Sequence, residues 1–217
     1  MTVHQAFSTV VFDLDGVLID SFGVMRQAFA AAYREVVGDG EPPFDEYCTH
    51  QGRYFPDIMR LMGLPEGMER PFVEASHRLI HEVEVYPDVP LVLKRLRESE
   101  VRTAIATGKS GDRARTVLEV VGLLPLLDTV VGSDEVDRPK PAPDIVREAL
   151  RRLASEPGDA VMVGDAVIDI QSGRSAGTAT AAALWGETAT DQLIDEKPDF
   201  VLARPTDLLA LVQGGVR

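Results

Sequence analysis

The chain is short of several residue types, and each shortage excludes a class of protein. Cys48 is the only cysteine among 217 residues, which excludes an intramolecular disulfide and fits a reducing compartment. No apolar run reaches the roughly 18 residues that a membrane-spanning helix needs. The first residues also lack the basic and then apolar pattern of a secretory signal. We therefore expect a cytoplasmic protein with no membrane partner.

Positive charge is scarce as well. The 22 lysines and arginines face 35 aspartates and glutamates, giving a formal net charge of −13. Such a surface repels nucleic acid and anionic membranes, so neither is expected as a partner. A small phosphorylated metabolite stays compatible, because cations inside a cleft can oppose the overall charge. Composition does not decide between a monomer and a homodimer.

From Pro87 onward, short β-branched or small apolar runs alternate with amphipathic helical runs. This alternation predicts βαβ units and an α/β fold with a doubly wound, Rossmann-like parallel sheet. The expected strands are 9–12, 102–107, 128–132, 160–164, 178–184 and 200–202, and the expected helices are 89–96, 114–121, 145–153, 168–176 and 207–212.

Residues 21–86 interrupt that rhythm and read as helical throughout. Helices are expected from Val24 to Val36, around 58–62 and over 72–83. We therefore predict an α/β core domain formed by 1–20 and 87–217, with 21–86 inserted as a small helical cap domain. The cap is expected over the carboxyl ends of the strands, where open α/β sheets bind ligands. Hinges are expected at its two junctions with the core, next to residues 20 and 87.

Polar residues lie just after four of the expected strands, either directly at the strand end or in the loop that follows it. Because parallel strands share one carboxyl edge, residues far apart in sequence converge there. The residues concerned are Asp13 and Asp15 after the first strand, Thr107, Gly108 and Lys109 after the second, Lys140 in the loop after the third, and Asp165 with Asp169 after the fourth.

This set of residue types indicates chemistry on phosphate. The carboxylates of Asp13, Asp15 and Asp165 need a cation, and hard oxygen ligands without histidine or cysteine favour Mg²⁺. Lys140 offers the phosphate a point charge, and Thr107 a hydroxyl. The backbone N–H of Gly108 suits a phosphate oxygen as well. A carboxylate nucleophile would divide hydrolysis into two easier displacements, while Asp15 would move the proton.

These residues carry a family resemblance. The motifs are Val11-Phe12-Asp13-Leu14-Asp15-Gly16-Val17-Leu18, Thr107, Lys140, and Gly164-Asp165-Ala166-Val167-Ile168-Asp169. In this order they resemble the four motifs of the haloacid dehalogenase superfamily. The chain is similar to its phosphoglycolate-phosphatase-like subgroup, which has a helical cap between the first and second motifs.

The resemblance implies a role for each matched residue. Asp13 would be the nucleophile and Asp15 the general acid and base. Magnesium would be held by the carboxylates of Asp13 and Asp165 and by the backbone carbonyl of Asp15. Asp169 would hold a metal-bound water or Lys140. Thr107 and Lys140 would hold the phosphoryl group.

Two positions depart from the family pattern. Val17 stands where many of these phosphatases have threonine, and Gly108 stands where asparagine is common. Some members with valine at the first position are phosphomutases. The expected activity is hydrolysis of a small phosphate monoester, of the phosphoglycolate or sugar-phosphate type, with a mutase of the beta-phosphoglucomutase type as the alternative. Gly164 favours the hydrolase, since the mutases tend to carry glutamate there.

Other members of the superfamily fit less well. A dehalogenase has no use for Asp15 or Asp165. A phosphonate hydrolase needs a lysine in the cap, and residues 21–86 contain none. A non-catalytic scaffold would not need the intact set of motifs.

The cap offers weaker signals. Arg53 lies in a predicted loop, where it either reaches the substrate or is a surface residue. The segment 52–59 also resembles phosphatases associated with 3-amino-5-hydroxybenzoate synthesis, which would imply a sugar-derived substrate. His77 and His81 share a helix face but have no third ligand, so no metal is expected there. Trp185 is expected to pack in the core, with lining of the cleft as the alternative.

Overall fold

The structure is a computed structural model, and it describes residues 7–212. The outermost parts of the predicted core domain, 1–6 and 213–217, lie outside the described residues. No helix in the described part of the chain is long and apolar enough to cross a membrane.

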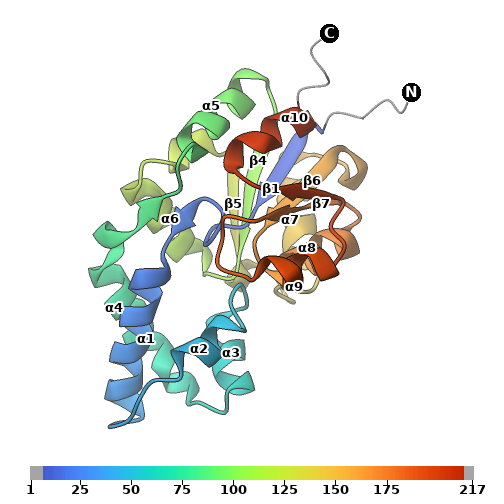
Figure 1. Cartoon of the computed structure of the whole chain (residues 1–217). Coiled ribbons are helices and arrows are strands. Elements are labelled where there is room, and N and C mark those ends of the chain that lie inside the picture. The colour runs from blue at the N-terminus through green and yellow to red at the C-terminus, as the bar shows by residue number, and fades with distance from the viewer. Residues whose placement is uncertain (1–6, 213–217) are drawn as a thin grey trace.

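A six-stranded parallel sheet forms the centre of the molecule, in the order β5-β4-β1-β6-β7-β8 (Figure 1). Its first strand is central because Thr9–Phe12 is fully buried and pairs on both sides, Val11 lying opposite Ala104 and Met162. The fold class predicted from the sequence is thereby confirmed. The strands are β1 (Thr9–Phe12), β4 (Arg102–Thr107), β5 (Thr129–Gly132), β6 (Ala160–Gly164), β7 (Ala179–Ala183) and β8 (Phe200–Leu202).

Helices cover both faces of the sheet, and the alternation of side chains along β1 accounts for this. Val10 and Phe12 pack into one apolar cluster with residues of α5 and α6. Val11 points the other way, into a second cluster with residues of α7. The helices of this part are α5 (Val89–Glu98), α6 (Gly111–Val120), α7 (Asp144–Leu153), α8 (Val167–Ala176), α9 (Thr190–Asp195) and α10 (Leu209–Val212), with 3₁₀ turns at Leu124–Leu126, Ser133–Glu135, Pro157–Asp159 and Pro205–Leu208.

The segment between β1 and α5 is mainly helical and has an apolar cluster of its own, which includes Phe29, Tyr47 and Phe72. Its helices are α1 (Phe22–Val36), α2 (Phe44–Cys48), α3 (Phe55–Leu61) and α4 (Glu69–Arg78), with 3₁₀ turns at Glu66–Met68 and Ile80–Glu82. Figure 1 shows α1, α2 and α3 at the lower end of the sheet, away from α10.

The expectation that 21–86 is helical throughout is wrong at its end. Strand β2 (Ile19–Asp20) pairs antiparallel with β3 (Glu84–Val85), so the chain leaves and re-enters the α/β part through a two-stranded ribbon. Two-residue strands leave no periodic pattern, and this pair is created by tertiary contact. The helix expected over 72–83 starts three residues earlier and ends at Arg78, where a 3₁₀ turn follows.

Candidate active site

Three of the predicted polar residues meet at the carboxyl edge of the sheet. Asp13 extends the pairing of β1 by donating its backbone N–H to the carbonyl of Val163 at 2.9 Å. Thr107 ends the neighbouring β4, and Asp165 directly follows β6. All three side chains are buried and line one cavity. The parallel register that was expected from the sequence therefore brings these residues together.

Lys140 lies beneath this edge and is fully buried. Its Nζ donates to Asp13 Oδ1 at 2.8 Å and to Asp169 Oδ1 at 2.6 Å. The other oxygen of Asp169 accepts the backbone N–H of Ala166 at 3.0 Å, where α8 begins. Asp169 is thus fixed by the start of a helix, and it fixes Lys140 in turn. This is one of the two positions that the sequence analysis gave for Asp169.

Asp13, Asp165 and Asp169 form a buried group whose ligand oxygens all lie within 4.8 Å of one another. Lys140 donates to two of these three carboxylates, and in the described part of the chain Asp165 has no ion-pair partner, so negative charge is in excess. Burial raises the pKa of Asp165 well above its usual value, and the charges of Asp13 and Asp169 add to this rise. Burial and the neighbouring carboxylates likewise raise the pKa of Asp13, although Lys140 opposes them. A hard divalent cation would relieve this excess, so the donor set fits Mg²⁺.

Glycines leave the room that these carboxylates need. A Cβ on Gly16 would lie 2.0 Å from Asp165 Oδ2, and one on Gly186 would lie 2.3 Å from the Asp165 Cβ. The backbone N–H of Glu187 also donates to Asp165 Oδ2, at 3.0 Å. Asp165 is therefore held in one position from several sides.

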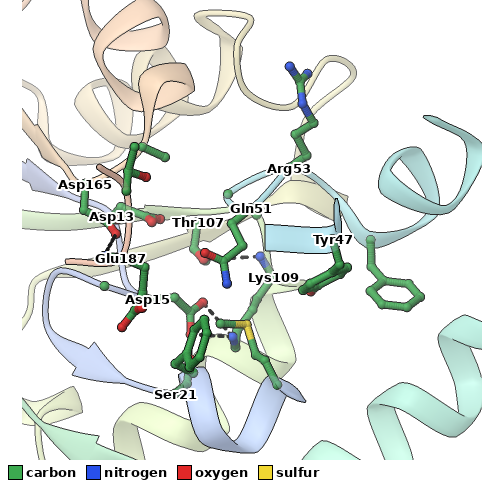
Figure 2. Close-up of a pocket in the computed structure, with 18 of the residues that line it drawn as sticks. Asp13, Asp15, Ser21, Tyr47, Gln51, Arg53, Thr107, Lys109, Asp165 and Glu187 are labelled. Carbon is green, nitrogen blue, oxygen red and sulfur yellow. Dashed lines mark hydrogen bonds and ion pairs between the residues drawn. The ribbon is translucent and has the colours of Figure 1, made fainter. Parts of the chain in front are cut away.

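Asp15 does not join the carboxylate group, although the residue types alone suggested that it would. Its carboxylate accepts Lys109 Nζ, 2.6 Å from each oxygen, and the hydroxyl of Ser21 (Figure 2). Burial acts to raise the pKa of Asp15, but the charge and hydrogen bonds of Lys109 and Ser21 outweigh it and lower that pKa. Asp15 is thus held in its charged form.

The segment after β4 lies against the loop that follows α2. The Thr107 hydroxyl oxygen accepts the backbone N–H of Lys109 at 3.2 Å, which leaves its own proton free for another acceptor. At Gly108, a Cβ would lie 2.3 Å from the carbonyl oxygen of Gly52 and 2.7 Å from that of Arg53. The glycine that departs from the family pattern is therefore required by this close approach.

The loop after α2 brings the side chains of Gln51 and Arg53 to the cavity in different orientations. Arg53 lies at the rim of the cavity, but its guanidinium points away from Asp13 and Thr107 in Figure 2. The side chain of Gln51 points inward instead, and its Nε2 is buried without a hydrogen-bond partner. Arg113, on α6, lines the cavity as well.

Sequence reasoning assigned no role to Gln51, Lys109, Arg113 or Glu187, all of which line the cavity. Lys109 follows Thr107 by two residues, and its place next to this motif could have indicated that it lies in the site. The other three give no signal in sequence, because their place depends on how the helical segment and the loop after β7 dock.

Trp185 packs against the core, as the sequence analysis expected, and its indole N–H donates to the carbonyl of Val17 at 3.0 Å. Cys48 lies apart from the carboxylate group, and burial raises the pKa of its thiol to about 11.

The departure at Val17 concerns the core rather than the cavity. Its side chain is fully buried in the apolar cluster with α5, and it does not line the cavity. Valine at this position therefore changes packing and leaves the set of polar groups around Asp13 unaltered.

Comparisons with known proteins agree with this arrangement. Residues 10–183 match the family described as "Haloacid dehalogenase-like hydrolase". The phosphoglycolate phosphatase of Aquifex aeolicus is 32% identical over 212 residues, which cover 95% of this chain and 97% of that one. Pyrophosphatase PpaX of Bacillus pumilus is 34% identical over 220 residues, covering 96% and 98%.

A solved structure of a haloacid dehalogenase-like family protein from Streptococcus pneumoniae superposes with a TM-score of 0.79 at 24% identity, covering 98% of this chain and all of that one. The chain belongs to the haloacid dehalogenase-like hydrolase family. The family predicted from the four motifs is thereby confirmed, as is the expectation of an enzyme of the phosphatase type.

Proposed function

We propose that the protein is a Mg²⁺-dependent phosphatase that hydrolyses a small phosphate monoester through a phosphoryl group carried on Asp13. The observation that carries this proposal is the buried group of Asp13, Asp165 and Asp169 around Lys140, open to a cavity that the Thr107 hydroxyl also lines. This arrangement would combine a carboxylate nucleophile, a cation site made of oxygen ligands, and a hydroxyl that can donate a hydrogen bond to the phosphate.

Asp13 would attack the phosphorus atom, forming an Asp13–phosphate bond as the bond to the leaving oxygen breaks. Its Oδ1 is held by Lys140, which leaves Oδ2 as the attacking atom. The free Thr107 proton and the Lys140 charge would stabilise the phosphoryl oxygens. When bound, Mg²⁺ would supply further neutralisation of the phosphate charge, with the carboxylates of Asp13 and Asp165 as its ligands and Asp169 beside them.

Asp15 is placed to move protons in this reaction. Its charged form, kept by Lys109 and Ser21, is the form that takes a proton from an attacking water when the phosphoryl group leaves Asp13. In the first step the same carboxyl would give a proton to the leaving oxygen. It must take up that proton beforehand, which requires it to part from Lys109, and it returns to the charged form as the leaving group departs.

We also propose that residues 21–86 act as a cap, the core being 1–20 with 87–217, and that the β2–β3 ribbon is the hinge. The apolar cluster of the helical segment and the contact of Gly52 with Gly108 support this division. Closure would keep bulk water from the phosphoryl group. The partner is a phosphorylated metabolite in the cytoplasm, with no role for nucleic acid or membrane, as the net charge favours.

The substrate class is proposed to be of the phosphoglycolate or sugar-phosphate type. The names of the Aquifex aeolicus and Bacillus pumilus relatives, a phosphoglycolate phosphatase and a pyrophosphatase, favour small phosphate compounds. The cavity volume, about 50 Å³, also favours a small molecule. The resemblance of 52–59 to phosphatases of 3-amino-5-hydroxybenzoate synthesis stays a prediction.

The proposal is tested by measuring free phosphate released from a panel of phosphate monoesters with Mg²⁺, with EDTA, and with the Asp13→Asn variant. Turnover is expected only in the wild-type protein with Mg²⁺. Equal release by the variant, or no effect of EDTA, would overturn the mechanism. The mutase alternative is decided with a sugar phosphate, since a mutase yields an isomeric phosphate and a hydrolase yields free phosphate.

A further inference from the structure

Two side chains that line the cavity, those of Arg113 and Gln51, have hydrogen-bond donors that the protein leaves unused. Arg113 donates one hydrogen bond, from Nη2 to the Ser76 hydroxyl at 3.2 Å, and stacks over the Phe72 ring at 5.4 Å. Among the described residues, no carboxylate lies within 4.0 Å of it, and Asp15 and Glu69 attract it only from farther away. The Nε2 of Gln51 is buried and has no partner at all.

Leaving such groups unpaired is costly. The half-buried guanidinium of Arg113 loses part of its solvation, and a buried amide N–H loses the bond it would make with water. A buried polar group without a partner calls for an explanation, and a ligand that pairs with it is one. Arg113 is also fixed in place, because Ser76 and Phe72 both belong to α4 and hold the guanidinium against the helical segment.

Charges of both signs line the cavity. Asp13 and Asp165 lie where the phosphoryl group would bind. Lys109, after β4, is already matched by Asp15. Among the described residues that line the cavity, Arg53 and Arg113 are the cations without an ion-pair partner, and Arg113 is the one that α4 holds in place.

We propose that the substrate carries a second anionic group close to the transferred phosphoryl group, and that Arg113 binds this group together with the Gln51 amide. This inference rests on the proposed phosphatase function and deepens it. Arg113 and Gln51 are specificity-determining residues, while the bond-breaking chemistry stays with Asp13. The anion can be a carboxylate or a second phosphate, because a guanidinium pairs with the oxygens of either.

The size of the cavity sets how far apart the two anions can lie. A volume of about 50 Å³ suits a small ligand better than an extended one. We therefore place the second anion close to the phosphate ester. The binding of one anion by Gln51 of the loop and by Arg113 of α6 would also join the helical segment to the α/β part.

The test compares matched substrates with and without the second anion. In the carboxylate arm, 2-phosphoglycolate is compared with ethyl phosphate, and in the phosphate arm, pyrophosphate is compared with methyl phosphate. The wild type is expected to favour the dianionic member of at least one pair in kcat/KM. In Arg113→Met that preference should fall by about 30-fold or more, the lower end of what removing one partner of a buried charged contact costs.

Further variants separate recognition from general damage. Arg113→Lys should recover part of the preference, because it keeps the charge but loses the planar fork. Gln51→Leu should lower the preference by about tenfold, as expected for one hydrogen bond to an anion. The control is Arg95→Met, on the exposed side of α5, where the guanidinium is paired with Glu98 away from the cavity. This variant should leave the preference unchanged.

A binding measurement keeps the two proposals distinguishable. Calorimetry in EDTA-containing buffer compares the affinity of wild type and Arg113→Met for 2-phosphoglycolate and ethyl phosphate without turnover. Tighter binding of 2-phosphoglycolate that is lost in the variant supports the second-anion site, even if no phosphatase activity were found. Equal preference in wild type and Arg113→Met in both arms, with phosphate released normally, overturns the inference and leaves the phosphatase proposal intact.

Discussion

Replacing Gly16 with alanine tests whether the position of Asp165 matters for metal binding and activity. Gly16 has a φ of +76°, and a Cβ there would lie 2.0 Å from Asp165 Oδ2. Gly122 offers a matched control, since its φ is +74° but a Cβ there would meet nothing within 4 Å. The two variants share the backbone cost of alanine in a left-handed conformation, about 1–2 kcal/mol, and differ only in the clash.

The clash in Gly16→Ala has no inexpensive relief. Asp165 is buried, Gly186 lies against its other side, and its Oδ2 accepts the N–H of Glu187. Moving the carboxylate would break that hydrogen bond, at a further cost of about 1.5–3 kcal/mol for a bond to a charged group. It would also displace a proposed ligand of Mg²⁺.

Urea unfolding in EDTA and in saturating MgCl₂, together with phosphate release, measures the consequences. Wild type and Gly122→Ala should both gain free energy of unfolding from Mg²⁺, about 1.4 kcal/mol when its concentration is ten times Kd. Gly16→Ala should gain much less and lose about 100-fold or more in kcat/KM, the scale expected when a catalytic group moves by roughly 1 Å. Equal activity and equal stabilisation by Mg²⁺ in the two variants would refute the reasoning.

Three further substitutions have distinct expected outcomes. Lys140→Met leaves Asp13 and Asp169 without their buried counter-charge, so it should abolish phosphate release. Urea denaturation in EDTA should show that the free energy of unfolding falls by about 3–5 kcal/mol. Unchanged stability would contradict the pairing. Gly108→Ala should displace the loop after α2 and raise KM, with the thermal midpoint as a check on folding; unaltered kinetics would mean that the loop is free to move. Trp185→Phe loses the hydrogen bond to the Val17 carbonyl, so it should cost about 1 kcal/mol of stability and leave kcat/KM unchanged, whereas a large fall in activity would place Trp185 in the site.

The α/β part of the fold could be predicted well because local pattern and tertiary structure agree there. The run Thr9–Phe12 is buried throughout since both faces of the sheet are covered, and Asp13 directly follows its end. Parallel strands then placed Thr107 and Asp165 on the same edge without further information. The position of Lys140 followed the same logic, because the loop after β5 runs under that edge.

The parts that escaped prediction depend on contacts between distant segments. The β2–β3 ribbon pairs residues that lie on either side of the whole helical segment. Asp15 pairs with Lys109 instead of joining the other carboxylates, and composition alone does not decide which of these two arrangements forms. Arg113 reads as a surface helix residue beside Asp112, and only the docking of α4 makes it part of the cavity.

The helix α9 was missed for a simpler reason. Its six residues bury one side chain, that of Leu193, so it has no amphipathic pattern to detect. The short helix α2 is similar, and the two prolines before it favoured a loop. Neither omission affected the predicted site, because the residues of the carboxylate group come from the ends of fully buried strands and from the start of α8.

The central claim is that Asp13 carries the phosphoryl group during turnover. The direct measurement is acid quenching of the wild-type protein with Mg²⁺ and a substrate that it hydrolyses, followed by peptide mass spectrometry. The account predicts one phosphoryl group on the peptide that contains Asp13, absent from Asp13→Asn. A phosphoryl group on a different residue would contradict it, and so would steady phosphate release by Asp13→Asn.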